Sequence, residues 1–137
     1  MNSINVLENK ISAIKKYLGV LRKFKKHKFH EILADDFLKG SLERYLYLAT
    51  QATIELAEAT IAFKNFRKPT TYRETFEILN EEEVISKNLT QELVPMVGFR
   101  NAIAHDYEKF DYHKVEDVLE NKLKYIENFI KVIGELH

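Results

Sequence analysis

The feature that most constrains this chain is the spacing of its apolar residues, which recur every three or four positions along several long segments. This spacing places apolar side chains on one face of an α-helix, whereas a half-buried strand needs them at every second position. The first segment shows it at Ile4, Leu7, Ile11, Ile14, Leu18, Leu21 and Phe24. The sequence has no convincing two-residue period, and only four Gly and two Pro interrupt its 137 residues. It therefore predicts an all-α fold.

Local signals divide the chain into four long helices and one short helix, arranged as an up-and-down bundle. Thr71-Tyr72-Arg73-Glu74 predicts a capping box that opens the short helix, and Asn88 or Gln91 is expected to cap the fourth helix. Pro95 predicts a kink or a shifted start in that fourth helix, and Gly40 is expected to loosen the first turns of the second. The expected helices run from Asn2 or Ser3 into the run 22–30, from Asp35 or Asp36 to about Phe63, from Thr71 to about Glu82, from about Asn88 to the stretch 99–107, and from Asp111 to about Glu135.

Composition indicates one globular domain over residues 1–137, since 45% of the residues are apolar and 31% are charged. The absence of Cys excludes disulfides and thiol chemistry. The sequence has no apolar run of the roughly 20 residues that a membrane span needs and no signal-peptide pattern at its start, so we expect a cytoplasmic protein. Because the net charge is zero, binding to nucleic acid requires a local basic patch.

One such patch is the basic run 22–30, which follows the first predicted helix. Its cations are Arg22, Lys23, Lys25, Lys26 and Lys28, accompanied by His27 and His30. Cations are favourable at a helix C-terminus and usually remain solvated, which is one interpretation of the run. The other is a surface that contacts a phosphate backbone, with Phe24 and Phe29 nearby. Metal binding by the two histidines is disfavoured because the surrounding lysines repel a cation.

The stretch 99–107 gathers more reactive side chains than any other part of the chain. Arg100 carries a permanent, forked charge that suits a phosphate, and His105 exchanges a proton near neutral pH. Asn101, Asp106 and Tyr107 add hydrogen-bonding groups beside them. A structural interpretation remains open, in which His105 is a cation favoured by a helix C-terminus and Tyr107 is a packing aromatic.

The spacing Arg100, four residues, His105, one residue, Tyr107 resembles the signature of the HEPN superfamily and specifically of HepT-type toxins. The Asn after the arginine, the approach through residues 96–99, the stretch 72–74 and the predicted helix that contains Gln51 are also similar. Glu55 stands where many family members have Asp. The similarity covers nearly the whole chain and implies the helical HEPN fold.

This resemblance implies a metal-independent endoribonuclease that needs no cofactor and cleaves an RNA substrate. Arg100 would hold the scissile phosphate, and His105 would act as general base or acid on the ribose 2′-hydroxyl or the leaving oxygen. Asn101 and Asp106 would support the substrate or orient the histidine. The resemblance also implies a partner, a small MntA-type nucleotidyltransferase antitoxin that silences the toxin by transferring AMP to Tyr107.

Helix geometry adds one constraint to this implied site. At about 100° per residue, the side chains of Arg100 and His105 project roughly 140° apart on one helix. They converge only if the helix loosens after Ala104 or if two chains contribute to the site. A homodimer with the two motifs facing across a cleft satisfies this constraint, and the family is similar in this respect.

Two other functions remain open from the sequence. The chain could be a non-catalytic helical subunit that binds a nucleotidyltransferase and presents a substrate to it. It could also be a structural dimerisation bundle. Loss of RNA cleavage on mutation of Arg100 or His105 would distinguish the ribonuclease from the binding subunit.

Overall fold

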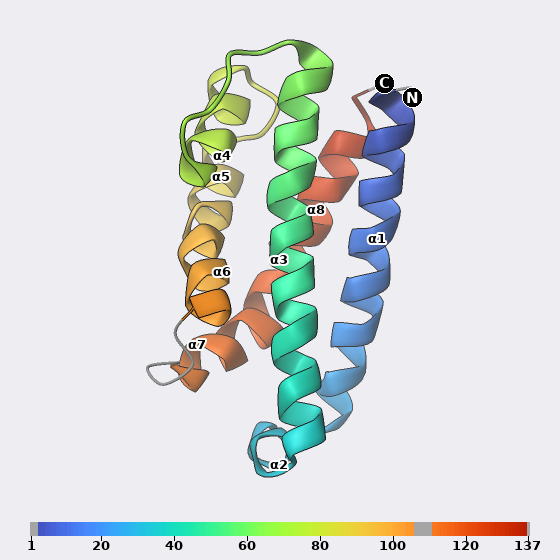
Figure 1. The fold of residues 1–137 in the computed structure, drawn as a ribbon, viewed down its shortest axis with the longest axis vertical. Coiled ribbons are helices and arrows are strands. Elements are labelled where there is room, and N and C mark those ends of the chain that lie inside the picture. Colours follow the sequence, from blue (N-terminus) through green and yellow to red (C-terminus); the bar gives the residue numbers. More distant parts are fainter. Residues whose placement is uncertain (1–2, 106–110, 137) are drawn as a thin grey trace.

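The computed structural model describes residues 3–105 and 111–136, and every regular element in these ranges is helical. The predicted all-α fold is therefore confirmed (Figure 1). The elements are α1 (Ser3–Lys23), η1 (Phe24–Lys26), α2 (Phe29–Ala34), α3 (Asp36–Lys64), α4 (Tyr72–Glu81), α5 (Lys87–Leu93), α6 (Pro95–His105), α7 (Tyr112–Asp117), η3 (Val118–Lys122) and α8 (Leu123–Gly134).

Helix α3 runs through the middle of the molecule, with α1 and α8 on one side and α4, α5 and α6 on the other (Figure 1). Its apolar face supplies fully buried side chains such as Leu46, Ile54 and Leu56. The rings of Phe76 on α4 and Phe129 on α8 meet edge to face, 5.8 Å apart, and join the two sides of the core. Burial of an apolar side chain of this size contributes about 1.5–3 kcal/mol to stability. The bundle is thus organised around α3.

Most predicted caps are present. Asp35 caps α3 by accepting hydrogen bonds from the backbone N–H groups of residues 37 and 38, and Asp111 caps α7 in the same way. Thr71 accepts from the N–H of Glu74 at 3.0 Å, as a capping box requires. The reciprocal half of the box was predicted wrongly, because the Glu74 carboxylate accepts from the N–H of Thr70 and not from that of Thr71.

Three other local predictions were wrong or incomplete. Ser86 caps α5 by accepting from the N–H of residue 89, so neither Asn88 nor Gln91 is the cap. Gly40 lies within continuous α-helix, where the surrounding packing overrides its conformational freedom. The short helix α2 was not predicted, and the last predicted helix is interrupted by the π-helical turn η3.

Pro95 acts as predicted. Helix α5 ends at Leu93 and α6 begins at Pro95, where the missing N–H of proline would have no intrahelical partner in any case. Helix α6 lies along α3, and it carries the first part of the polar motif (Figure 1).

Among the described residues, no helix combines the length and the apolar character needed to cross a bilayer. The cytoplasmic location and the single-domain organisation remain predictions.

The loop before α4 is tied to that helix by Arg67. The guanidinium donates to both carboxylate oxygens of Glu81 and to Glu74 at 2.8–3.1 Å. The hydrogen bonds from Arg67 hold the pKa of each of these carboxylates below its ordinary value. Bidentate pairs of this kind are geometrically specific, and this one ties the loop to the last residue of α4, while the hydrogen bond to Glu74 ties it to the first turn.

We predict that Arg67→Gln lowers the melting temperature near neutral pH, and that the difference from the parent narrows as the pH falls below 4.5. A carboxylate whose pKa is lower in the folded state than in the unfolded state stabilises the fold at pH values above its unfolded-state pKa. This stabilisation disappears as the pH falls through the folded-state pKa. Thermal unfolding from about pH 7 to about pH 3 measures this. The control is Arg73→Gln, whose exposed ion pair with Glu77 spans 3.8 Å. A pH-independent difference for Arg67→Gln would contradict the assignment.

Candidate functional site

Arg100 lies on the side of α6 that faces α3, and its side chain is half buried. Its Nε donates to Oε1 of Gln51 on α3 at 2.6 Å, and Nη1 donates to Oδ1 of Asn101 at 2.9 Å. A guanidinium presents five donors in a fixed plane, so these two hydrogen bonds determine the orientation of the group. Asn101 therefore contacts Arg100, while its expected role in supporting the substrate or orienting the histidine stays a prediction.

Two tyrosine rings flank this guanidinium. The Arg100 Cζ lies 5.5 Å from the ring centroids of both Tyr47 on α3 and Tyr72 on α4. Cation–π contacts at this distance hold a cation in place without neutralising its charge. Sequence reasoning did not assign a role to Tyr47, although its spacing of four residues from Gln51 places both on one face of α3.

The hydrogen bond to Arg100 belongs to a chain of polar contacts that crosses three helices. Gln51 donates through Nε2 to Oε1 of Glu55 at 3.3 Å, and Lys10 on α1 lies 3.5 Å from the other oxygen of that carboxylate. Gln51 and Glu55 therefore form a polar pair one turn apart on α3. Since a carboxylate accepts and a guanidinium donates, the amide of Gln51 has one favourable orientation, with its oxygen toward Arg100. Burial, and then the neighbouring charge of Glu55, raise the pKa of Glu58.

His105 is the last residue of α6 and is exposed. It lines a pocket of about 360 Å³ together with the first turns of α3, where the lining residues are Gly40, Glu43, Arg44 and Tyr47. Helix α6 remains helical through His105, so the loosening after Ala104 that could bring this side chain to Arg100 does not occur within the described part of α6. By ideal helix geometry the two motif side chains leave this helix about 140° apart, although Tyr47 lies beside Arg100 and also lines the pocket of His105.

Asp106 and Tyr107, the other two predicted site residues, lie outside the residues that the structure describes. Of the predicted site, the structure thus places Arg100, Asn101 and His105 on one helix, with Arg100 and Asn101 in direct contact.

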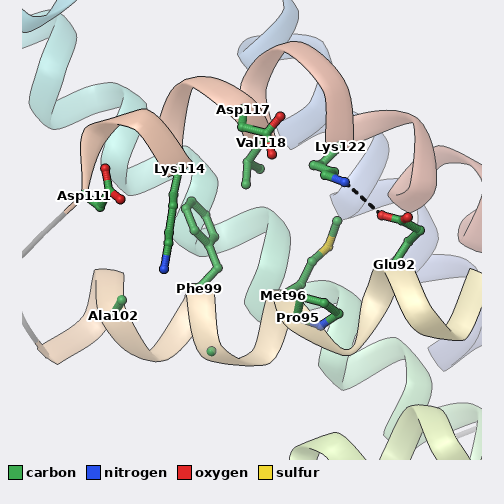
Figure 2. A pocket seen from close by; sticks show the side chains of 11 residues that line it. Glu92, Pro95, Met96, Phe99, Ala102, Asp111, Lys114, Asp117, Val118 and Lys122 are labelled. Carbon is green, nitrogen blue, oxygen red and sulfur yellow. Dashed lines mark hydrogen bonds and ion pairs between the residues drawn. The ribbon is translucent and has the colours of Figure 1, made fainter.

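A larger cavity lies on another face of α6, against α7 and η3 (Figure 2). Its volume is about 480 Å³, its walls include Met96, Phe99 and Val118, and an ion pair of 3.0 Å between Lys122 and Glu92 lies at its rim. Neither Arg100 nor His105 lines it. Cavity size therefore does not identify the reactive site, which instead follows from the positioned guanidinium.

Metal chemistry has no evident ligand set in this part of the protein. Across residues 3–105 and 111–136, no group of three or more His, Asp or Glu side chains is placed to hold a metal ion. The described side chains at the motif provide a fixed cation and an exposed imidazole, which together suit binding and proton transfer at a phosphodiester.

Comparison with known proteins agrees with this chemistry. Residues 9–133 match the family model described as Ribonuclease HepT-like. The chain belongs to the HepT-like ribonuclease family. The resemblance inferred from the motif is therefore confirmed, and the HEPN fold with it.

Three relatives show how far the likeness extends. A tRNA nuclease HepT from Aphanizomenon flos-aquae is 27% identical over 110 residues, which cover 80% of this chain and 75% of that protein. An mRNA nuclease HepT from Shewanella oneidensis is 28% identical over 133 residues, which cover 97% and 94%. A solved structure of a tri-AMPylated HEPN toxin of Shewanella oneidensis in complex with its MNT antitoxin has a TM-score of 0.87 at 28% identity, covering 98% of each chain.

We predict that Gln51→Leu releases the Arg100 side chain and lowers the free energy of unfolding by about 1 kcal/mol, because a half-buried donor loses its acceptor. The arginine Nε–Hε resonance in NMR spectra reports the release directly, through a chemical-shift change and faster exchange with water.

Gln91→Leu is the control, since Gln91 is exposed on α5. An unchanged Arg100 resonance in Gln51→Leu would show that the rings of Tyr47 and Tyr72 hold the guanidinium without the amide.

Proposed function

We propose that this chain is the toxin of a type VII-like toxin–antitoxin pair, a metal-independent endoribonuclease whose catalytic residues are Arg100 and His105. The observation that carries the proposal is the Arg100 guanidinium, held by Gln51 at 2.6 Å and flanked by two tyrosine rings, on the same helix as an exposed histidine. Family membership supports the same reaction class.

Cleavage in this proposal is a transesterification within the RNA. The ribose 2′-oxygen attacks the adjacent phosphorus, the bond from phosphorus to the 5′-oxygen breaks, and a 2′,3′-cyclic phosphate and a 5′-hydroxyl form. A base takes the proton of the 2′-hydroxyl, and an acid supplies one to the leaving 5′-oxygen. Arg100 offsets the charge that develops on the phosphoryl oxygens, and Asn101 helps to orient it. The role of Asp106 is to support the substrate or orient the histidine.

The active form in this proposal is a homodimer. A single His105 does not readily act as base and acid at once, and its side chain projects away from Arg100 on the same continuous helix. A two-fold axis near the end of α6 would bring two motifs to one cleft, so that each arginine works with a histidine of the partner.

We predict that Arg100→Ala and His105→Ala each abolish RNA cleavage measured with EDTA present, and that a heterodimer of the two variants regains measurable activity, below half of the parental value, because a single imidazole then serves both proton transfers. The heterodimer carries one intact arginine and one intact histidine on different chains, so a composite site reforms. Co-expression with two different tags allows its purification.

Lys131→Gln, at an exposed position on α8, is the matched control and should cleave like the parent. An RNA with 2′-deoxyribose at the scissile position should resist cleavage. An inactive heterodimer of confirmed composition would contradict the composite site. A folded, unmodified parent that cleaves no RNA in a broad pool would favour the non-catalytic binding subunit instead.

We further propose that a nucleotidyltransferase antitoxin silences this protein by transferring AMP to Tyr107. The support is the spacing of the motif and the AMPylated state of the Shewanella oneidensis toxin in its complex with an MNT antitoxin. Each AMP adds a phosphodiester charge two residues beyond His105 in the sequence. That charge would compete with the phosphate of RNA for arginine.

We predict that Tyr107→Phe stays toxic in cells and escapes silencing by the cognate antitoxin, because the phenolic oxygen is the acceptor of AMP. Intact mass after incubation with antitoxin and ATP measures the modification. Tyr125→Phe, on α8, is the control and should be modified and silenced like the parent. Full modification and silencing of Tyr107→Phe would show that another residue accepts AMP.

A further inference from the structure

A stripe of side chains on α3 leads away from Arg100 toward the N-terminal end of that helix. Its members are Phe37, Gly40, Arg44, Tyr47 and Gln51. Spacings of three and four residues place them within about 80° of arc along about 21 Å of helix. Gln51 binds Arg100, and the ring of Tyr47 lies against the same guanidinium. The Arg44 Cζ lies 5.9 Å from the centroid of that Tyr47 ring. The stripe is thus continuous with the proposed catalytic group.

Phe37, at the far end of the stripe, is the most exposed large apolar residue described. Its side chain is 91% exposed, whereas all the remaining phenylalanines that the structure describes are buried or partly buried against the core. Full exposure of an aromatic ring forgoes the 1.5–3 kcal/mol or so that burial would contribute. The backbone of Phe37 is fixed at the start of α3, because the Asp35 side chain accepts a hydrogen bond from the Phe37 N–H at 2.9 Å. A ring presented in this way can stack on a nucleobase.

Between Phe37 and Arg100 lies the pocket of about 360 Å³ that contains His105. Arg44 contributes an exposed cation to one wall, and Gly40 leaves open space where a side chain would stand. Glu43 contributes a carboxylate, which accepts a hydrogen bond from the Tyr112 hydroxyl at 2.6 Å. The Glu43 carboxylate can accept a hydrogen bond from a ribose hydroxyl or a base N–H group, whereas the Arg44 guanidinium suits a phosphate.

Charge gives the stripe a direction. Beyond Gln51 the same face of α3 continues to Glu55, which is paired with Lys10 at 3.5 Å, and to Glu58, a further carboxylate that would repel a phosphate backbone. At the other end, Phe37 lies close in sequence to the basic run 22–30, whose Lys and His side chains are exposed, and α2 packs against α3 there. Toward the N-terminal end of α3 a polyanion that passes Arg100 therefore meets Arg44 and the basic run, with the exposed carboxylates of Asp35 and Asp36 beside Phe37 as the opposing charges.

We infer that single-stranded RNA leaves the cleavage site along this stripe, with a phosphate bound by Arg44 and a base stacked on Phe37. This inference rests on the proposed ribonuclease function and names two substrate-binding residues for it. The pocket between them holds the nucleotide next to the scissile phosphate, with its ribose or base facing Glu43. Stacking tolerates any base, so Phe37 sets the path and the affinity of the RNA more than its sequence.

The test measures binding separately from cleavage. Fluorescence anisotropy of a labelled, random-sequence RNA of about 16 nucleotides is followed in the His105→Ala background. Phe37→Ala should weaken binding about tenfold, and Phe37→Tyr should restore it to within about twofold, because tyrosine keeps a stacking face. Arg44→Gln should weaken binding and reduce the slope of log K against log salt by about 0.7, the value for one phosphate contact on a single strand.

The matched controls separate stacking from charge. Phe37→Ala should leave the salt slope unchanged, since it removes no cation, and Lys131→Gln should change neither affinity nor slope. Sedimentation of each variant establishes that the oligomeric state equals that of the parent. In the cleaving background, Phe37→Ala should raise KM by about the same tenfold factor and leave kcat close to the parental value.

The outcomes distinguish this inference from the proposed function. If the parent cleaves RNA and Phe37→Ala binds it as tightly as the parent, the path along α3 is wrong and the ribonuclease assignment stands. If the parent cleaves nothing and both substitutions still weaken RNA binding, the path stands and the catalytic assignment fails. A Phe37→Ala protein that becomes monomeric, or that loses the antitoxin while it retains RNA affinity, would assign the ring to a protein interface and overturn the inference.

Discussion

The interaction on which the site depends is the hydrogen bond from Arg100 to Gln51, made where α6 packs on α3. A guanidinium keeps its charge even when half buried, so acceptors and ring faces must hold it. Gln51, Asn101 and the two tyrosine rings fulfil that requirement before any substrate arrives. A phosphate that binds this cation meets a group already oriented, and it loses less affinity to the ordering of a flexible arginine.

Helix α3 is the centre of the fold through its buried apolar face, and through this hydrogen bond it is also the floor of the candidate site. Its apolar residues, including Leu46 and Ile54, are fully buried, while Gln51 and Tyr47 remain half exposed beside α6. A side chain such as Arg100, which is hydrogen-bonded to a tightly packed helix, is held in place by the packing of that helix. Helix α4 joins the arrangement through Tyr72, and the Arg67 pairs hold the beginning of that helix.

Sequence reasoning predicted the all-α fold and the motif residues because both are local signals. Apolar spacing reports a helix face, and Asp35, Thr71 and Asp111 act within one turn of where they stand. What it missed depends on distant packing. The π-helical turn η3 has no local signal as strong as a proline, and the contact of Tyr47 with Arg100 joins residues that only the packing of α6 on α3 brings together.

The orientation of the motif residues could be predicted only in part for the same reason. Helix geometry already placed Arg100 and His105 about 140° apart, and the structure retains helix through His105. In the proposed homodimer, the convergence that the chemistry requires comes from a second chain, which a single sequence describes only by implication.

A cleft built in this way is unusually sensitive to added charge. The protein has no net charge to attract RNA, so in the proposed function its affinity for RNA depends on a few cations near α3 and on Arg100 itself. One phosphodiester attached near the motif can therefore neutralise a large share of the local attraction, and in a two-fold site it affects both motifs at once. In the proposed pairing, a nucleotidyltransferase suits the control of this protein because one covalently attached phosphodiester offsets part of the local positive charge that RNA meets.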